Sequence, residues 1–317
     1  STLLIHLSMK KLLVALLILA SGTPLLAQTL TSPDGNFKLT FWLTQAGEPE
    51  YQLDYKNKPV IKQSRLGIDI KDQTPLLKGF KLESITTDKK DETWDPVWGE
   101  VKTIRNNYNE LGLILTQSSP KERTMIIRFR LFNDGLGFRY EFPRQPNLQH
   151  FIVKDEVTQF AVTGDHKAFW IPGDFDTNEY TYSTTPLTKA DKSARIGSAD
   201  EIATRNPING AVQTPLMMKS AEGLYINIHE AALVNYPAMI LTIDKAKLTL
   251  TATLAPDGVG NKAYLQTPSH TPWRTIIVSD KAADILASKT ILNLNEPSVI
   301  KDTDWIKPTK YVGIWWE

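Results

Sequence analysis

The stretch Met125-Ile-Ile-Arg-Phe-Arg-Leu-Phe-Asn-Asp-Gly-Leu-Gly-Phe-Arg-Tyr-Glu-Phe142 decides the fold class of this 317-residue chain. Apolar side chains alternate with charged ones on both sides of a short turn at Asn133–Gly135. A period of two with one apolar face is what a half-buried antiparallel strand requires, and Asn, Asp and Gly suit tight turns. The stretch therefore predicts a β-hairpin. The Gly135-Leu-Gly137 pair belongs to this turn and not to a nucleotide loop, because no helix follows.

The same alternation recurs from Gln28 to about Ile300. It is present in Phe37–Phe41, Tyr51–Tyr55, Leu66–Ile70, Gly223–Ile228, Leu248–Leu254 and Trp273–Val278. Turn residues separate these runs at Ser32–Gly35, Lys56–Pro59 and Pro256–Gly258. Many short strands, regular turns and little helix predict an all-β fold, a large β-sandwich.

Two segments depart from this pattern. Asp280–Ala287 reads as a brief helix. Residues 183–212 are rich in Ser, Thr, Ala, Asn and Asp, with a weak helical signal at Thr188–Arg195. Loops of this length inside a compact domain are usually functional or mobile.

Residues 9–27 (MKKLLVALLILASGTPLLA) have the layout of a removable secretory signal peptide. Lys10 and Lys11 form the positive region, an apolar run follows, and Ala27 supplies the small-residue exit. The apolar run is too short to span a membrane, and a buried core helix is the alternative reading. Residues 1–8 precede the expected initiator methionine and are expected to be over-translated upstream sequence.

Composition indicates the compartment and excludes some partners. The chain has no cysteine, so an exported protein of this sequence relies on core burial and not on disulfides. Lys10 and Lys11 are the only charged residues of 1–27, and the remainder holds 34 basic and 35 acidic residues. Such a balance attracts neither nucleic acid nor anionic lipid. We expect a soluble periplasmic protein with a neutral ligand and no membrane insertion after signal removal.

Common catalytic motifs are absent from the sequence. His229-Glu230 begins a possible zinc motif, but Leu233 stands where the second histidine is required. No GxSxG elbow, P-loop or CxxC is present. The sequence therefore gives no support to a serine hydrolase, a nucleotide hydrolase or a thiol oxidoreductase.

The most chemically loaded segment follows Pro172-Gly173. It carries four oxygen-bearing side chains within six residues: Asp174, Asp176, Asn178 and Glu179. Clustered oxygen ligands suit a hard cation such as calcium. The EF-hand pattern is not matched, because Glu179 and Thr185 occupy the positions that require glycine and glutamate. A solvated acidic loop is the alternative to a metal site.

Several aromatic residues could stack against a sugar ring. They are Trp94, Trp98, Tyr108, Trp170 and Trp273. Packing in the core or in an interface is the alternative for each of them.

The C-terminal segment differs from the strands before it. Pro297 and Pro308 are typical of a linker, and Tyr311–Trp316 is apolar almost without a break. Such a strand requires burial on both faces, as in a parallel sheet covered by helices. We expect a second domain to begin here and to be truncated at Glu317.

Several blocks of the sequence resemble glycoside hydrolase family 97. The blocks are Asp91–Glu100, Arg105–Glu110, Arg128–Phe142, Ala168–Tyr180, Leu224–Leu233, Gln266–Asp280 and Lys310–Trp316. The likeness runs from about Leu30 to the last residue and is greatest to the α-glucosidases of bacterial starch-utilisation systems. It implies a β-super-sandwich, a catalytic (β/α)8 barrel and a small C-terminal β-domain. Residues 28–295 would then be the sandwich domain, and residues 296–317 the linker and the first strand of a truncated barrel.

The resemblance also implies chemistry: hydrolysis of α-glycosidic bonds, with a calcium ion in the active site. It assigns Glu179 as a calcium ligand that reaches from the sandwich into the barrel mouth. It places Trp316 near the C-terminal end of the first barrel strand, where it would bind sugar or, alternatively, pack. The catalytic acid and base would lie in the barrel, so none is expected up to Glu317 and this chain alone is expected to be inactive.

The α-linked oligosaccharide substrate and the missing barrel are thus the expected partners. Two alternatives remain open for the function. The sandwich could be a stand-alone carbohydrate-binding module, or the same domain of a retaining α-galactosidase.

Overall fold

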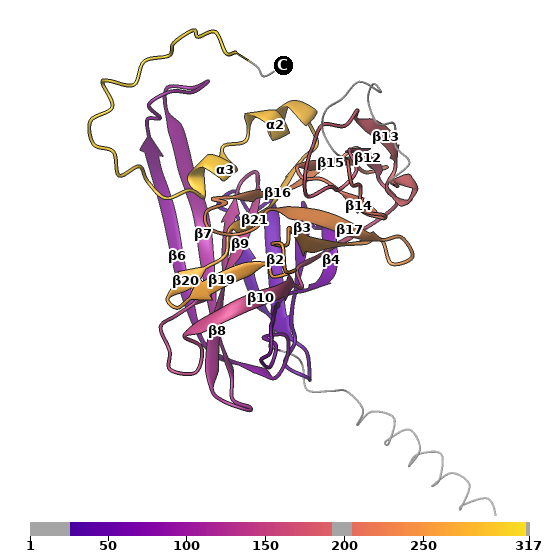
Figure 1. Cartoon of the computed structure of the whole chain (residues 1–317), viewed down its shortest axis with the longest axis vertical. Coiled ribbons are helices and arrows are strands. Elements are labelled where there is room, and N and C mark those ends of the chain that lie inside the picture. Colours follow the sequence, from indigo (N-terminus) through magenta and orange to yellow (C-terminus); the bar gives the residue numbers. More distant parts are fainter. Residues whose placement is uncertain (1–25, 192–204, 315–317) are drawn as a thin grey trace, which may run out of the picture.

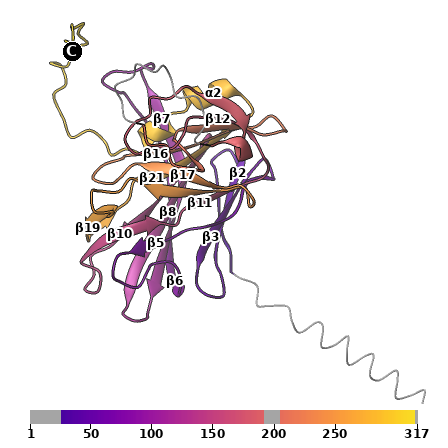
Figure 2. The same ribbon diagram turned by 45° about the vertical axis from the view of Figure 1, so that its right-hand side comes forward.

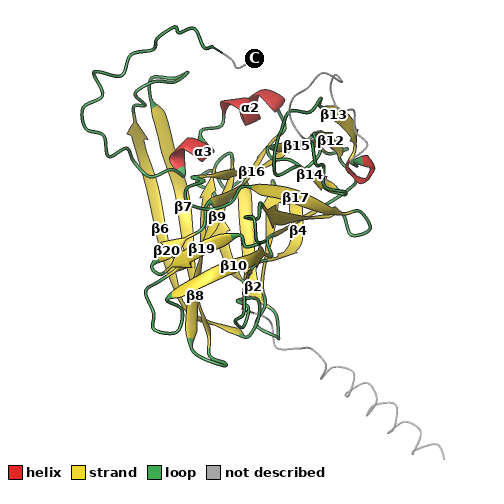
Figure 3. Cartoon of the chain, in the orientation of Figure 1, coloured by secondary structure: helices red, strands yellow, loops and turns green. Residues whose placement is uncertain are grey.

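The computed structural model describes residues 26–191 and 205–314 of the chain. Residues 1–8, most of the expected signal peptide 9–27, and Trp316 lie outside these described residues. Strands dominate the described part, and the few helices are short (Figure 3). The prediction of an all-β sandwich is confirmed. No helix in the described ranges has the length and apolar character needed to cross a membrane.

One of the two large sheets contains eight strands. In spatial order they are β1 (Gln28–Thr31), β2 (Phe37–Leu43), β3 (Pro49–Tyr55), β4 (Lys58–Arg65), β11 (Gln159–Val162), β18 (Thr249–Leu254), β17 (Met239–Asp244) and β14 (Ala211–Val212). Neighbouring strands pair antiparallel, as expected where hairpins connect them.

The other large sheet contains ten strands. In order they are β13 (Ser183–Pro186), β12 (Lys167–Trp170), β15 (Leu216–Lys219), β16 (Tyr225–Ala231), β21 (Trp273–Ser279), β9 (Gly135–Phe142), β8 (Arg123–Phe132), β7 (Ile104–Gln117) and β6 (Phe80–Trp94), with β20 (Ser269–His270) paired to β9. A third sheet has the order β19 (Ala263–Gln266), β10 (His150–Glu156) and β5 (Ile68–Ile70). The helices are the 3-10 turn η1 (Leu187–Lys189), α2 (Ala282–Ala287) and α3 (Thr290–Asn293).

The hairpin expected at residues 125–142 is present as β8 and β9, paired from Ile126–Glu141 to Leu131–Leu136. Its two faces differ as the alternation requires. The charged residues pair across strands on one face: Arg128 contacts Glu110 of β7 and Glu141 of β9, each at 2.8 Å. Opposite charges on adjacent strands stabilise the sheet, so the polar half of the pattern also contributes to its pairing.

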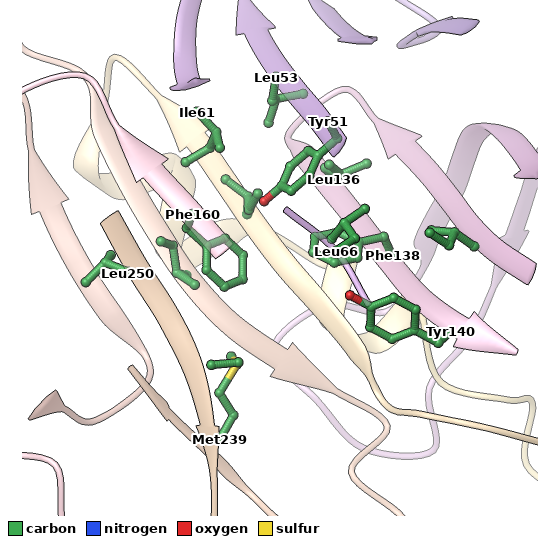
Figure 4. Packing of buried hydrophobic residues seen from close by; sticks show 14 of the residues in the cluster. Tyr51, Leu53, Ile61, Leu66, Leu136, Phe138, Tyr140, Phe160, Met239 and Leu250 are labelled. Atoms are coloured by element: carbon green, nitrogen blue, oxygen red, sulfur yellow. The ribbon is translucent and has the colours of Figure 1, made fainter. Parts of the chain in front are cut away.

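The apolar half of the alternation forms the core between the two large sheets (Figure 4). The ring centroid of Phe138 lies 5.7 Å from that of Phe129 on the neighbouring strand of its own sheet. It lies 5.3 Å from the ring of Tyr51 and 6.2 Å from the ring of Phe160, both on the eight-stranded sheet. Tilted aromatic rings at these distances pack favourably and stabilise the face-to-face contact of the two sheets.

A buried ionic cluster joins the third sheet to the ten-stranded sheet. Arg274 of β21 donates to Glu156 of β10 at 2.8 and 2.7 Å and to Glu230 of β16 at 2.7 Å. The Arg274 and Glu156 side chains have no exposed surface. His229, the neighbour of Glu230, contacts Thr214 at 3.1 Å. In the structure Glu230 serves this ion pair.

Most strands are short, as expected, but β6, β7 and β8 are longer than the sequence pattern indicates. β6 has 15 residues and pairs with β7 along its whole length, from Phe80–Gln117 to Trp94–Ile104. Beyond Leu82 the side chains of β6 are exposed on both faces, so no apolar alternation marks the strand. Figure 1 shows this hairpin at one margin of the sandwich. The charges of its Asp88–Glu92 segment protect an edge strand from further pairing.

The segments that break the strand pattern have mixed outcomes. The helix expected in Asp280–Ala287 is confirmed as α2. In residues 183–212 the structure forms β13, η1 and β14 around an undescribed stretch. The barrel strand expected from Tyr311 to Trp316 is not confirmed. Its described residues, 311–314, are exposed and belong to no sheet. A strand requires a hydrogen-bonded neighbour, and these residues have none among the described strands.

Candidate metal-ligand loop

The loop that contains Glu179 connects β12 to β13 at one end of the sandwich. Figures 1 and 2 both show β12 at the same end as α2. The two strands pair over four residues, and the indole nitrogen of Trp170 donates to Thr185 across them at 3.0 Å. The two ends of the loop, residues 171–182, are therefore held together by this pair of strands.

Gly173 anchors the start of this loop to the segment before β14. Its amide donates to the carbonyl of Ala211, and its carbonyl accepts from the amide of Ile208, both at 2.8 Å. A Cβ at Gly173 would lie 2.8 Å from the Cβ of Ala211, so only glycine allows this close approach. Two backbone hydrogen bonds, to Ala211 and Ile208, therefore hold the start of the loop just before its acidic residues.

Asp174 is the hub of the loop and points inward, with a side chain only 2% exposed. One carboxylate oxygen accepts from the Tyr180 hydroxyl at 2.6 Å and from the Asn206 amide at 2.7 Å. The other oxygen accepts from the Asp176 amide at 2.9 Å. Burial alone would raise the pKa of Asp174, but these donors hold it below its ordinary value of 3.8. Burial, followed by the Asp174 carboxylate, raises the pKa of Tyr180.

Glu179 is one of the loop residues whose side chains are exposed to solvent, together with Asp176 and Asn178. Its amide donates to Thr177 at 3.1 Å, and its carbonyl accepts from the Arg205 guanidinium at 2.9 Å. Its side chain is exposed, and no hydrogen bond joins its carboxylate to another described residue. The backbone at Glu179 is fixed while its carboxylate projects outward.

The oxygen cluster expected from sequence spacing does not converge in space. Asp174 is occupied by the loop, and Asp176 accepts from the Asn206 side chain at 3.0 Å. No group of three or more His, Cys, Asp or Glu within residues 26–191 and 205–314 is arranged to hold a metal ion. Glu179 can supply one hard oxygen ligand, and a calcium site with six to eight ligands would need others from elsewhere.

The hub role of Asp174 was missed by the sequence reasoning, which treated the four polar residues as equivalent. A signal was available, because an aspartate two residues before an amide donor is the pattern of an Asx turn. The contributions of Asn206 and Arg205 carried no such signal, since they come from a segment about 30 residues away.

The five aromatic candidates separate into two groups. Tyr108, Trp170 and Trp273 are buried and serve packing. Trp94 and Trp98 are exposed, 36% and 54% respectively, and both belong to the end of the β6–β7 hairpin. The structure therefore leaves only these two with a face available to a ligand.

Comparison with known proteins supplies the family. The sequence matches the family described as "Glycosyl-hydrolase 97 N-terminal" over residues 30–297. A curated relative, the "Retaining alpha-galactosidase" of Bacteroides thetaiotaomicron, is 26% identical over 341 residues. That alignment covers 97% of this chain and 47% of the relative.

Solved structures agree with this match. Structures of a glycoside hydrolase family 97 enzyme from Pseudoalteromonas sp. strain K8, one with panose and one with acarbose, are 36% identical to this chain with a TM-score of 0.79. They cover 89% of this chain and 40% of theirs. A β-arabinopyranosidase structure, 20% identical with a TM-score of 0.66, covers 80% of this chain and 40% of its own and shares the fold. The chain thus spans less than half of the length of these relatives.

The β-sandwich and the family match together define the class of protein: the N-terminal β-sandwich domain of a glycoside hydrolase. The chain belongs to glycoside hydrolase family 97, whose N-terminal region it matches. The earlier resemblance to this family is confirmed.

Proposed function

We propose that this chain is the N-terminal part of a calcium-dependent α-glycosidase and that Glu179 ligates the calcium ion of its active site. The observation that carries the proposal is the geometry of the β12–β13 loop. An anchored backbone presents the exposed Glu179 carboxylate, which has no hydrogen bond to another described residue, while Asp174 holds the loop and Asp176 accepts from Asn206. A fixed oxygen ligand loses little entropy on binding a cation, as a preorganised site requires.

The remaining ligands, with the catalytic acid and base, would come from a (β/α)8 barrel that follows the linker. Barrel active sites lie at the C-terminal ends of the strands, where a neighbouring domain can contribute a side chain. Calcium there would polarise the glycosidic region and orient the sugar and the attacking water. Residues 296–317 would be the linker and first barrel strand, with Trp316 in the sugar pocket.

We infer an α-glucoside as the substrate. The relatives that are 36% identical were solved with panose and acarbose, which mimic or contain α-linked glucose. The retaining α-galactosidase is less similar, at 26% identity. The α-galactoside remains the second candidate on the strength of that relative. The signal peptide 9–27 would direct the protein to the periplasm and be removed after export.

The test compares the 317-residue chain with the polypeptide extended through the downstream reading frame. Both are assayed on p-nitrophenyl α-glucoside and p-nitrophenyl α-galactoside, with calcium and with a chelator. We expect no turnover by the chain alone and calcium-dependent cleavage of the glucoside by the extended polypeptide. Turnover by the chain alone, or cleavage that survives complete calcium removal, would refute the proposal. Preference for the galactoside would establish the second candidate.

The stand-alone binding module is distinguished from the enzyme domain by the reading frame. An authentic stop codon directly after Glu317 would favour the binding module, and a reading frame that continues in βα repeats would favour the enzyme.

A further inference from the structure

A cavity of about 440 Å³ lies between the end of the β6–β7 hairpin and α3. Figure 1 shows α3 beside the upper part of this hairpin. The walls include Trp94 at the end of β6, Asn106 on β7, Leu292 on α3, and Glu296 in the segment that follows. Its volume is in the range of small-ligand sites. The cavity is separate from the Glu179 loop, which connects β12 to β13.

Asn106 is the most informative residue in this cavity. Its side chain is 8% exposed, so it is more than nine-tenths buried. Its amide oxygen has no hydrogen-bond partner, and its amide nitrogen forms no bond with another described residue either. Buried amides are normally satisfied because an unpaired one retains its full desolvation cost. A hydroxyl group of a ligand could pair with this amide, because Asn106 lines the cavity.

Trp94 supplies a fixed aromatic face. Its indole nitrogen donates to the Asn293 side chain at 2.8 Å, and the Asn293 amide donates to the carbonyl of Arg105 at 2.9 Å. These bonds tie the end of β6 to α3 and to β7. The indole remains 36% exposed although it is held in place. A preorganised indole packs well against the C–H face of a pyranose ring.

Three carboxylates complete the lining: Glu92, Asp95 and Glu296. Glu92 pairs with Lys90 at 3.2 Å and Asp95 accepts from Thr103 at 2.7 Å, but each carboxylate has further acceptor positions for hydroxyl groups. The three carboxylates together disfavour an anionic ligand. A purely apolar ligand would leave the Asn106 amide unpaired. The combination of an indole face, an unpaired amide and carboxylate acceptors therefore selects a neutral polyhydroxylated ligand.

We propose that this cavity binds a neutral saccharide of one or two pyranose rings. The site rests on the geometry of the described residues. Only the choice of an α-linked glucose oligosaccharide as its first probe rests on the proposed function.

The test measures maltotriose binding to the full chain by isothermal titration calorimetry. We expect saturable binding with a Kd in the millimolar range. Asn106→Leu should weaken it about tenfold, the effect of one or two lost hydrogen bonds. The melting temperature should not fall, because the amide makes no bond within the described protein. Glu296→Gln changes a side chain that is 76% exposed, so it should fold as the parent does and also weaken binding. Trp305→Ala is the matched control, an exposed tryptophan outside the cavity that should leave the affinity unchanged.

Absence of saturable binding, or equal affinity in the parent, Asn106→Leu and Glu296→Gln, would overturn the proposal. So would binding that requires calcium or that disappears in Glu179→Gln, since the site would then be the Glu179 loop. These outcomes are separate from those of the cleavage assay. A chain that binds maltotriose at this cavity while the extended protein fails to cleave would refute the proposed function alone.

Discussion

Replacing Asp174 by asparagine tests whether this residue builds the loop that presents Glu179. The side chain would keep one oxygen, which can accept from the Asp176 amide as in the parent. The new amide group would face the Tyr180 hydroxyl, which can rotate to accept, and the Asn206 backbone amide, which cannot. One buried backbone donor is therefore stranded, at a cost of about 1–3 kcal/mol.

The assay is native-state hydrogen exchange at the Asn206 amide. A cost of that size lowers the local opening free energy enough to speed exchange about 5- to 150-fold. Tyr180→Phe is the control, because it removes one donor but leaves both backbone amides bonded to the carboxylate. Acidification below pH 3.8 should reproduce the effect in the parent. The pKa of Asp174 is lowered in the fold, so its contribution is present above 3.8 and is lost as pH falls through the folded pKa. Unchanged exchange in Asp174→Asn, or equal exchange in both variants, would refute the hub role.

Two further predictions concern stability, measured by guanidinium unfolding. In the buried cluster, Glu156→Gln should cost about 3–5 kcal/mol, because Glu156 accepts two bonds from Arg274 and others from Thr158 and Tyr236. Glu230→Gln should cost at most about 1 kcal/mol at pH 7, since burial raises the pKa of Glu230. As pH falls toward 4.5 the parent gains stability from protonation of Glu230, so the variant should become less stable relative to the parent. Equal costs of the Glu156 and Glu230 substitutions would contradict this asymmetry. Gly135→Ala should cost about 1–3 kcal/mol because the new Cβ would collide with the carbonyl oxygen of Ile276. Gly258→Ala is the control, since its Cβ would meet open space and the change should be neutral. A neutral Gly135→Ala would contradict the packing described.

The sandwich could be predicted from sequence wherever one face of a strand is buried. The hairpin around Gly135 alternates because Phe129 and Phe138 enter the core while Arg128 and Glu141 pair outside it. β6 could not be predicted in this way. Its outer part is exposed on both faces, so its strand conformation depends on pairing with β7, which is a long-range property that no local pattern records.

The candidate loop was predictable in composition but not in geometry. The spacing of Asp174, Asp176, Asn178 and Glu179 indicated oxygen ligands, yet it could not show that Asp174 turns inward. That orientation depends on the Asn206 amide and on the Gly173 contact with Ala211, both supplied by a distant segment. The unpaired amide of Asn106 was equally hidden, because β6, β7 and α3 enclose it only in the folded protein.

The central claim is that the Glu179 carboxylate binds calcium, and calcium affinity of the extended enzyme tests it most directly. The measurement compares Glu179→Gln with Asn178→Ala, an exposed neighbour whose change leaves the carboxylate in place. Loss of a charged ligand should weaken calcium binding at least about tenfold and reduce glycoside cleavage in parallel, while Asn178→Ala behaves as the parent. Unaltered calcium affinity in Glu179→Gln would contradict the account.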